Sequence, residues 1–166
     1  MAARAGWTES VWSIGFYERL SKSLSLYAQH IGWLHSRPKR HEKETSPPAR
    51  IDGLRKDDPL RDLPECDEVV LSAFIAVGRS SFTGEAHVPI TWSEVESYSR
   101  MSGAMLTPWE ANQVINMSRI YCSTKAEATN DPMMPPPYMD DSEEYLERTR
   151  KSVSDQIKRA FSSKAP

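Results

Sequence analysis

The sequence has few cysteines, no long apolar run and almost no net charge. Its 166 residues include only two cysteines, Cys66 and Cys122, which lie far apart and in no metal-binding pattern. We therefore expect free thiols in a reducing compartment. The formal net charge of -2 gives no overall attraction to nucleic acid. No window approaches the ~20 apolar residues of a membrane span, and we expect no signal peptide.

Residues arranged for catalysis or metal binding are also missing. The four histidines are not spaced four residues from another zinc ligand: they are His30, His35, His41 and His87. The chain has no glycine-rich phosphate loop. Paired carboxylates such as Asp57-Asp58 lie in polar stretches, without the pocket that catalytic carboxylates need. The sequence therefore predicts no enzyme and no catalytic, cofactor or metal site.

Apolar periodicity predicts helices. One helical face contains Cys66, Val69, Val70, Ala73, Phe74 and Val77, and Gly78 follows it as a helix end. Two further helices begin with capping boxes, Thr91-Trp92-Ser93-Glu94 and Thr107-Pro108-Trp109-Glu110. The first of these is lined by Trp92, Val95, Tyr98 and Met101. We predict an all-α fold with a small three-helix core at 64–77, 92–102 and 108–124, and a loop over 79–89.

The composition divides the chain into five regions. We predict a helical arm at 1–36, a flexible linker at 37–63, the helical core at 64–130, a Pro-rich linker at 131–141 and a charged C-terminal helix or tail at 142–166. The first linker has too little apolar surface to offset the entropy of ordering. Its basic cluster, Arg37 to His41, is either a solvated stretch or a contact for an acidic partner or nucleic acid.

Two surfaces are candidates for partner binding. The arm has a heptad-like seam, which consists of Tyr17, Leu20, Leu24, Tyr27, Ile31 and Leu34. Gly15 and Gly32 weaken this helix. Because the linker separates the arm from the core, we expect the seam to be exposed and to bind a partner helix or a second copy. In the Pro-rich segment, Met133, Met134 and Tyr138 suit adaptable protein contact, and folding back onto the core is the equal alternative.

The two capped helices also have the outline of a helix-turn-helix DNA reader. The second helix would present Asn112, Gln113, Asn116 and Arg119, of which only the arginine is basic. Glu110 stands where phosphates would bind. A DNA-binding regulator is therefore a distant alternative, and nucleic acid is an improbable partner.

The residues at 88–98, Gly103, 106–111 and 117–121 resemble small proteins of phage tail gene clusters. These are tail assembly chaperones of long-tailed phages, and the resemblance spans about 66–128. It implies a chaperone that binds the long helical tape-measure protein, or another tail protein, in the host cytoplasm before the tail tube closes. A structural or adaptor protein retained in the virion tail is the alternative.

Overall fold

The computed structural model describes residues 6–39 and 47–139, together with isolated positions between 143 and 158. Its elements are helix α1 (Gly6–Leu34), α2 (Arg50–Gly53), the short 3-10 helix η1 (Pro59–Arg61), α3 (Glu68–Val77), strands β1 (Ser81–Phe82) and β2 (His87–Val88), α4 (Trp92–Ser102) and α5 (Pro108–Asn130). The predicted all-α fold class is confirmed. The predicted C-terminal helix at 142–166 lies largely outside the described residues.

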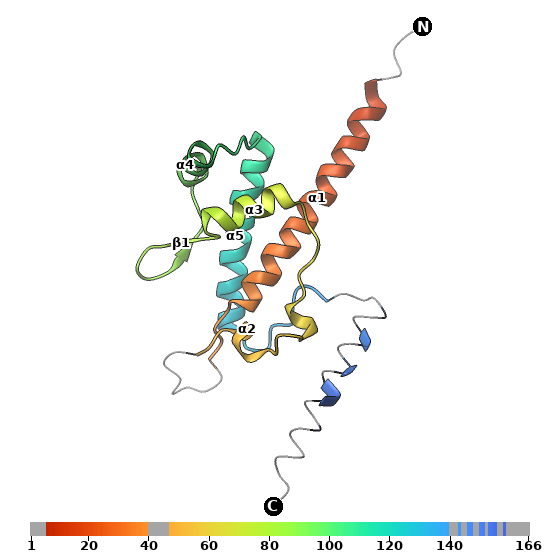
Figure 1. The fold of residues 1–166 in the computed structure, drawn as a ribbon, viewed down its shortest axis with the longest axis vertical. Coiled ribbons are helices and arrows are strands. Elements are labelled where there is room, and N and C mark those ends of the chain that lie inside the picture. The colour runs from red at the N-terminus through yellow and green to blue at the C-terminus, as the bar shows by residue number, and fades with distance from the viewer. Residues whose placement is uncertain are drawn as a thin grey trace, which may run out of the picture.

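Helices α1 and α5 form the centre of the molecule. The C-terminal half of α1 runs beside α5, while its N-terminal half extends beyond the rest of the fold (Figure 1). The second half of the heptad seam is at most 6% exposed, and it consists of Leu24, Tyr27, Ile31 and Leu34. It shares one hydrophobic core with Val114, Met117 and Tyr121 of α5.

The prediction of a separate arm with an exposed seam is therefore wrong for this half of the helix. The periodicity identified a face that needs a partner helix, and α5 of the same chain is that partner. Helix α5 continues to Asn130, six residues past its predicted end at 124, so it offers α1 a long surface. The predicted arm and the predicted core form one packed unit.

Gly32 lies where α1 packs tightly against α5. An added Cβ atom at this position would stand 2.8 Å from the carbonyl oxygen of Tyr121 and 3.3 Å from the Cβ of Thr124. A contact of 2.8 Å with backbone cannot be relieved by rotating a side chain, so only glycine fits. The glycine that weakens an isolated helix is what allows these two helices to meet.

Arg50 fixes the segment before α3 to the end of α5. Its Nε donates to Ser36 Oγ at 2.9 Å. Its terminal nitrogen donates to three carbonyl oxygens at the C-terminal end of α5, those of Ala128 (3.1 Å), Asp131 (2.9 Å) and Pro132 (3.2 Å). Carbonyls at a helix end lack partners within the helix, so this guanidinium satisfies them. The prediction of a flexible linker is therefore wrong for 47–63.

A buried histidine of α1 contacts the part of this segment that contains η1. His30 is 0% exposed, and its Nε2 lies 2.9 Å from the carbonyl oxygen of Leu60. Its ring stacks on Trp33, with centroids 5.8 Å apart. Burial lowers the pKa of His30, so the neutral ring donates from Nε2 to the carbonyl. Asp58 caps η1 by accepting from the backbone N–H of Leu60 at 3.0 Å.

On the other side of α5 lie α3 and a small hairpin. Helix α3 starts at Glu68 rather than at the predicted residue 64, because Asp67 caps it by accepting from Val70 N–H at 2.9 Å. The predicted loop at 79–89 contains the antiparallel pair β1–β2, in which Ser81 faces Val88. Ser118 of α5 anchors both ends of the hairpin, since its hydroxyl accepts from Ile90 N–H at 2.9 Å and donates to the Arg79 carbonyl at 2.6 Å.

Both capping boxes form between the residues that the sequence indicated. The backbone N–H of Glu110 donates to Thr107 Oγ1 at 3.3 Å, and that of Thr107 donates to the Glu110 carboxylate at 2.6 Å. The equivalent pair at the start of α4 is Thr91 and Glu94. Helix α4 has the predicted bounds, and α5 begins at the predicted proline.

The glycines of α1 provide a matched test of the helix crossing. Gly32→Ala should destabilise the protein by about 1–3 kcal/mol, because the added methyl group overlaps backbone of α5. Gly15→Ala meets nothing within 4 Å and should leave stability unchanged or raise it by up to about 1 kcal/mol. Urea unfolding measures both. Equal effects of the two substitutions would contradict the close approach.

The α5 cap gives a second stability prediction. Thr107→Ala should lower the free energy of unfolding by about 1 kcal/mol, because the N–H of Glu110 loses its acceptor. Thr107→Ser retains the hydroxyl and serves as the control. An unfolding midpoint for Thr107→Ala equal to that of the wild type would show that the box contributes nothing.

Candidate partner-binding groove

A shallow groove lies between α3 and α4. Its volume is about 610 Å³, and its lining residues are Ala76, Val77, Ser93, Glu94, Ser97, Tyr98, Met101 and Ser102. The six lining positions on α4 recur every three to four residues, so they make up one face of that helix. One whole face of α4 is therefore open toward the C-terminal end of α3.

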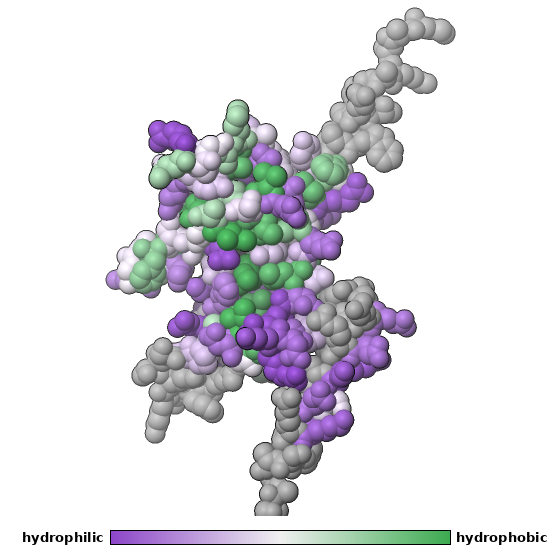
Figure 2. Space-filling view, viewed as in Figure 1, coloured by the Kyte–Doolittle hydropathy of each residue, from purple (hydrophilic) through white to green (hydrophobic). Residues whose placement is uncertain are grey.

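Large exposed apolar side chains occur in the lining of this groove and at positions next to it in the sequence. Met101 lines it and is 89% exposed, and Met105 follows three residues after the last lining position with 96% exposed. Ile75 and Trp92 each precede a lining residue, and both are exposed. Figure 2 shows that apolar surface also gathers over α3. Single exposed apolar residues are ordinary, but a group of them around a groove indicates a contact surface.

Sequence periodicity did not identify this site. It placed Trp92, Val95, Tyr98 and Met101 together on one face of the helix. In the structure only Val95 of these four is buried, while Trp92 and Met101 are exposed. The open face depends on where α3 ends, at Gly78 with φ +113°, and no local pattern within α4 contains that information.

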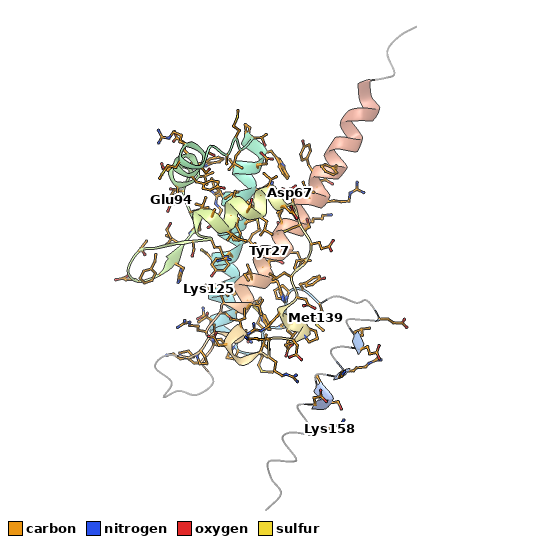
Figure 3. The ribbon with its side chains drawn as sticks, viewed as in Figure 1. Tyr27, Asp67, Glu94, Lys125, Met139 and Lys158 are labelled. Atoms are coloured by element: carbon orange, nitrogen blue, oxygen red, sulfur yellow. The ribbon has the colours of Figure 1, made fainter. Side chains whose placement is uncertain are left out.

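Glu94 fixes the N-terminal end of the groove (Figure 3). Its carboxylate accepts hydrogen bonds from the Ser81 hydroxyl of the hairpin, from Thr91 N–H at 2.6 Å and from the Thr91 hydroxyl at 2.8 Å. These bonds, with that of Ser81 the most important, lower the pKa of Glu94. A charged carboxylate at a helix N-terminus is also favoured by the helix dipole. The Glu94 carboxylate thus joins the hairpin to α4 and holds the α4 wall of the groove in position.

The described residues offer little for covalent or metal chemistry. No group of three or more histidine, cysteine or acidic side chains among them is arranged to hold a metal ion. Burial raises the pKa of the Cys66 thiol to about 11 and also raises that of Cys122. Such thiols stay protonated at neutral pH and are poor nucleophiles. What the groove offers is contact through Ala76, Val77, Tyr98 and Met101, with three serines and Glu94 as its polar lining.

The seam predicted to bind a partner is only partly accessible. Leu24, Tyr27, Ile31 and Leu34 are buried against α5 and are not available to another protein in this fold. Tyr17 is exposed, with its ring 4.9 Å from that of Trp109, and Leu20 is half-buried. Only this N-terminal part of the seam remains open for the predicted self-association.

The Pro-rich segment largely folds back onto the core. Met134 packs against the core, and its carbonyl accepts from Trp33 Nε1 at 2.9 Å. Tyr138 places its ring edge-on to His30, with centroids 5.7 Å apart. Of the three residues predicted here, only Met133 is largely exposed. Of the two alternatives that the sequence left open, folding back describes Met134 and Tyr138.

The helix-turn-helix interpretation fits the fold poorly. Its reading helix would be α5, which is the central helix of the core. Gln113, expected to face DNA, is only 7% exposed. A recognition helix needs a free face along its first turns, and here α5 buries Gln113 and Val114 there.

Comparison with known families bears directly on the resemblance. Residues 46–123 match the family model described as phage tail assembly chaperone. The chain is similar to phage tail assembly chaperones. The resemblance predicted from the sequence is confirmed, and the match supports a chaperone role in tail assembly. A match to this family suggests a non-catalytic role. No curated protein and no solved structure matches the chain.

The groove lies inside the segment that matches the chaperone family. All eight lining residues fall between 76 and 102, inside the matched segment, whereas α1 precedes it. The match begins at residue 46 and so includes α2 and η1, which the resemblance seen in the sequence left out. Among the described residues, no helix has the length and apolar character needed to cross a membrane.

The hydrogen bonds to Glu94 predict an acid-dependent loss of stability. Because the folded pKa lies below the ordinary 4.5, the charged carboxylate stabilises the fold above pH 4.5, and this contribution is lost as the pH falls through the folded pKa. Glu94→Gln should therefore be less stable than wild type at pH 7, and the difference should be smaller at pH 3. Thermal unfolding at both pH values measures the difference.

Glu96→Gln is the control for this comparison, since Glu96 lies on the exposed side of the same helix and makes only a long 3.9 Å ion pair with Arg100. It should show little change at either pH. If Glu94→Gln matches wild type at pH 7, the carboxylate does not hold the hairpin to α4.

Proposed function

We propose that this chaperone-like protein binds the tape-measure protein during tail assembly, and that the groove between α3 and α4 is the contact. The observation that carries the proposal is an open groove, lined by both apolar and polar side chains, wholly within the segment that matches the tail assembly chaperone family. The encounter takes place in the cytoplasm of the bacterial host, before the tube closes around the tape measure.

The shape of the groove suits an amphipathic helix. Helix α4 has 11 residues and is about 16 Å long, which is room for about three turns of a partner helix. A long helical protein that waits for its tube has apolar stripes exposed to water, and such stripes promote aggregation. The groove covers one part of such a stripe.

The character of the surface favours adaptable and reversible contact. Met101 lines the groove, and Met105 follows three residues after the last lining position. Methionine side chains adjust to partners of different shape. Eight lining residues are fewer than the 20–30 residues per side of a standard stable interface. Reversible binding is what an assembly chaperone needs, because the tape measure must be released to the tube.

The proposal predicts a charge-sensitive interface. The double substitution Met101→Glu and Met105→Glu should weaken co-purification with the co-expressed tape-measure protein by about tenfold or more, because two carboxylates would be desolvated against an apolar stripe. Both side chains are almost fully exposed, so circular dichroism should show an unchanged fold.

Met133→Glu is the matched control. Met133 is also almost fully exposed, at 87%, but lies outside the groove and outside the matched segment. It should retain wild-type binding. Loss of binding on Met133→Glu with retention in the double variant would assign the interface to the Pro-rich segment instead. Presence of the chain in purified particles at fixed stoichiometry would favour a retained structural protein over a chaperone.

A further inference from the structure

A second cavity lies where the end of α1, the start of α2, the hairpin and the last turns of α5 come together. Its volume is about 670 Å³, and it is lined by His35, Arg37, Ala49, Asp52, His87, Tyr121, Lys125 and Thr129. It shares no lining residue with the α3–α4 groove. Figure 3 shows Lys125 on α5, well separated from Glu94 on α4.

Positive charge gathers around this cavity without a matching negative charge. Lys125 and Arg37 line it, and Arg79 stands close enough to act on both His35 and Tyr121. Within the described parts of the chain, none of these three cations forms an ion pair. The buried Nε of Arg79 has no hydrogen-bond partner there. Asp52 is the one carboxylate in the lining, and it already accepts from Ala49 N–H at 3.1 Å.

Burial and the positive charges around the cavity lower the pKa values of neighbouring basic groups. Burial, followed by the charge of Arg37, lowers the pKa of Lys125. Burial lowers the pKa of His35 to about 4, and the charges of Arg79 and Lys125 contribute. The pKa of His87 is lowered by burial and then by Lys125 and Arg37. Asp52 acts on His35 in the opposite direction, but the cations around the cavity outnumber this carboxylate, although the whole chain carries a net charge of -2.

Neutral hydrogen bonds hold the walls of the cavity in place. Tyr121 and His35 are bonded through the phenol oxygen and Nδ1 at 3.0 Å. Thr129 Oγ1 accepts from Arg37 N–H at 3.3 Å and donates to the Lys125 carbonyl at 2.7 Å. The Lys125 ammonium lies 5.6 Å from the centre of the Tyr121 ring, which positions it without neutralising it. Hydrogen-bonded walls around an ammonium group that forms no ion pair with the described residues are features of a binding site.

We propose that this cavity binds an oxyanion, the phosphate or carboxylate group of a ligand, through Lys125 and Arg37, with Arg79 supplying further positive charge. An oxyanion provides the acceptors and the negative charge that the described residues leave missing. The site is independent of the α3–α4 groove and does not rest on the proposed function. Its residues come from segments 35–37, 49–52, 87 and 121–129, and of these the sequence singled out only Arg37, as part of a basic cluster.

The test is calorimetric titration of the full chain at constant ionic strength, with inorganic phosphate in one arm and a hexaglutamate peptide in the other. Saturable binding with a single site is expected. Lys125→Met should weaken it about tenfold or more, because a charge-assisted hydrogen bond is lost. Asp52→Asn should tighten it, since the substitution removes the one lining carboxylate and leaves an oxygen to accept from Ala49 N–H.

Arg119→Met is the matched control, because Arg119 is an exposed cation of the same helix outside the cavity. It should leave affinity unchanged. Preference for phosphate would identify a phosphate ligand, and preference for the peptide would identify the carboxylates of an acidic protein segment. Equal losses in Lys125→Met and Arg119→Met would overturn the proposal, as would the absence of saturable binding in both arms. If Lys125→Met does not fold, the gain expected in Asp52→Asn decides the outcome.

Discussion

The approach of α1 to α5 at Gly32 is the constraint on which the rest of the fold depends. A side chain at this position would push the helices apart, and the apolar faces that share the core would lose contact. Once the two helices are together, other parts of the chain pack against the pair. The segment around Arg50 covers one end of α5, and α3 packs on another side, where Phe74 meets Tyr121 edge-on at 6.4 Å.

Features whose interactions are local were predictable from the sequence. The capping boxes at Thr91 and Thr107 involve residues three positions apart, so a four-residue pattern contains all the information. Gly78 and Gly103 end their helices in the left-handed conformation for the same kind of reason. The family resemblance rests on these same caps and on core positions, which is why sequence alone was able to reveal it.

Features that depend on distant contacts were not predictable. A seam from Leu24 to Leu34 shows that a face will be buried, but it does not say whether another chain or the same chain buries it. In the sequence, Arg50 is one charged residue in a polar stretch. The hydrogen bonds described above join it to residues 14 to 82 positions away. The groove and the cationic cavity both arise from elements that only the fold brings together. The sequence therefore indicated single parts of them, such as Arg37 and Met101, but not the sites themselves.

The position of α1 has a consequence for what the family match represents. The matched segment at 46–123 begins after α1, although α1 supplies the side chains that complete the core around α5. Without that helix, the faces of Val114, Met117 and Tyr121 would lose their cover on one side. The unit that sequence similarity recognises is therefore smaller than the unit that folds. In this chain, the matched segment therefore depends on α1, which lies outside it, to bury one side of α5.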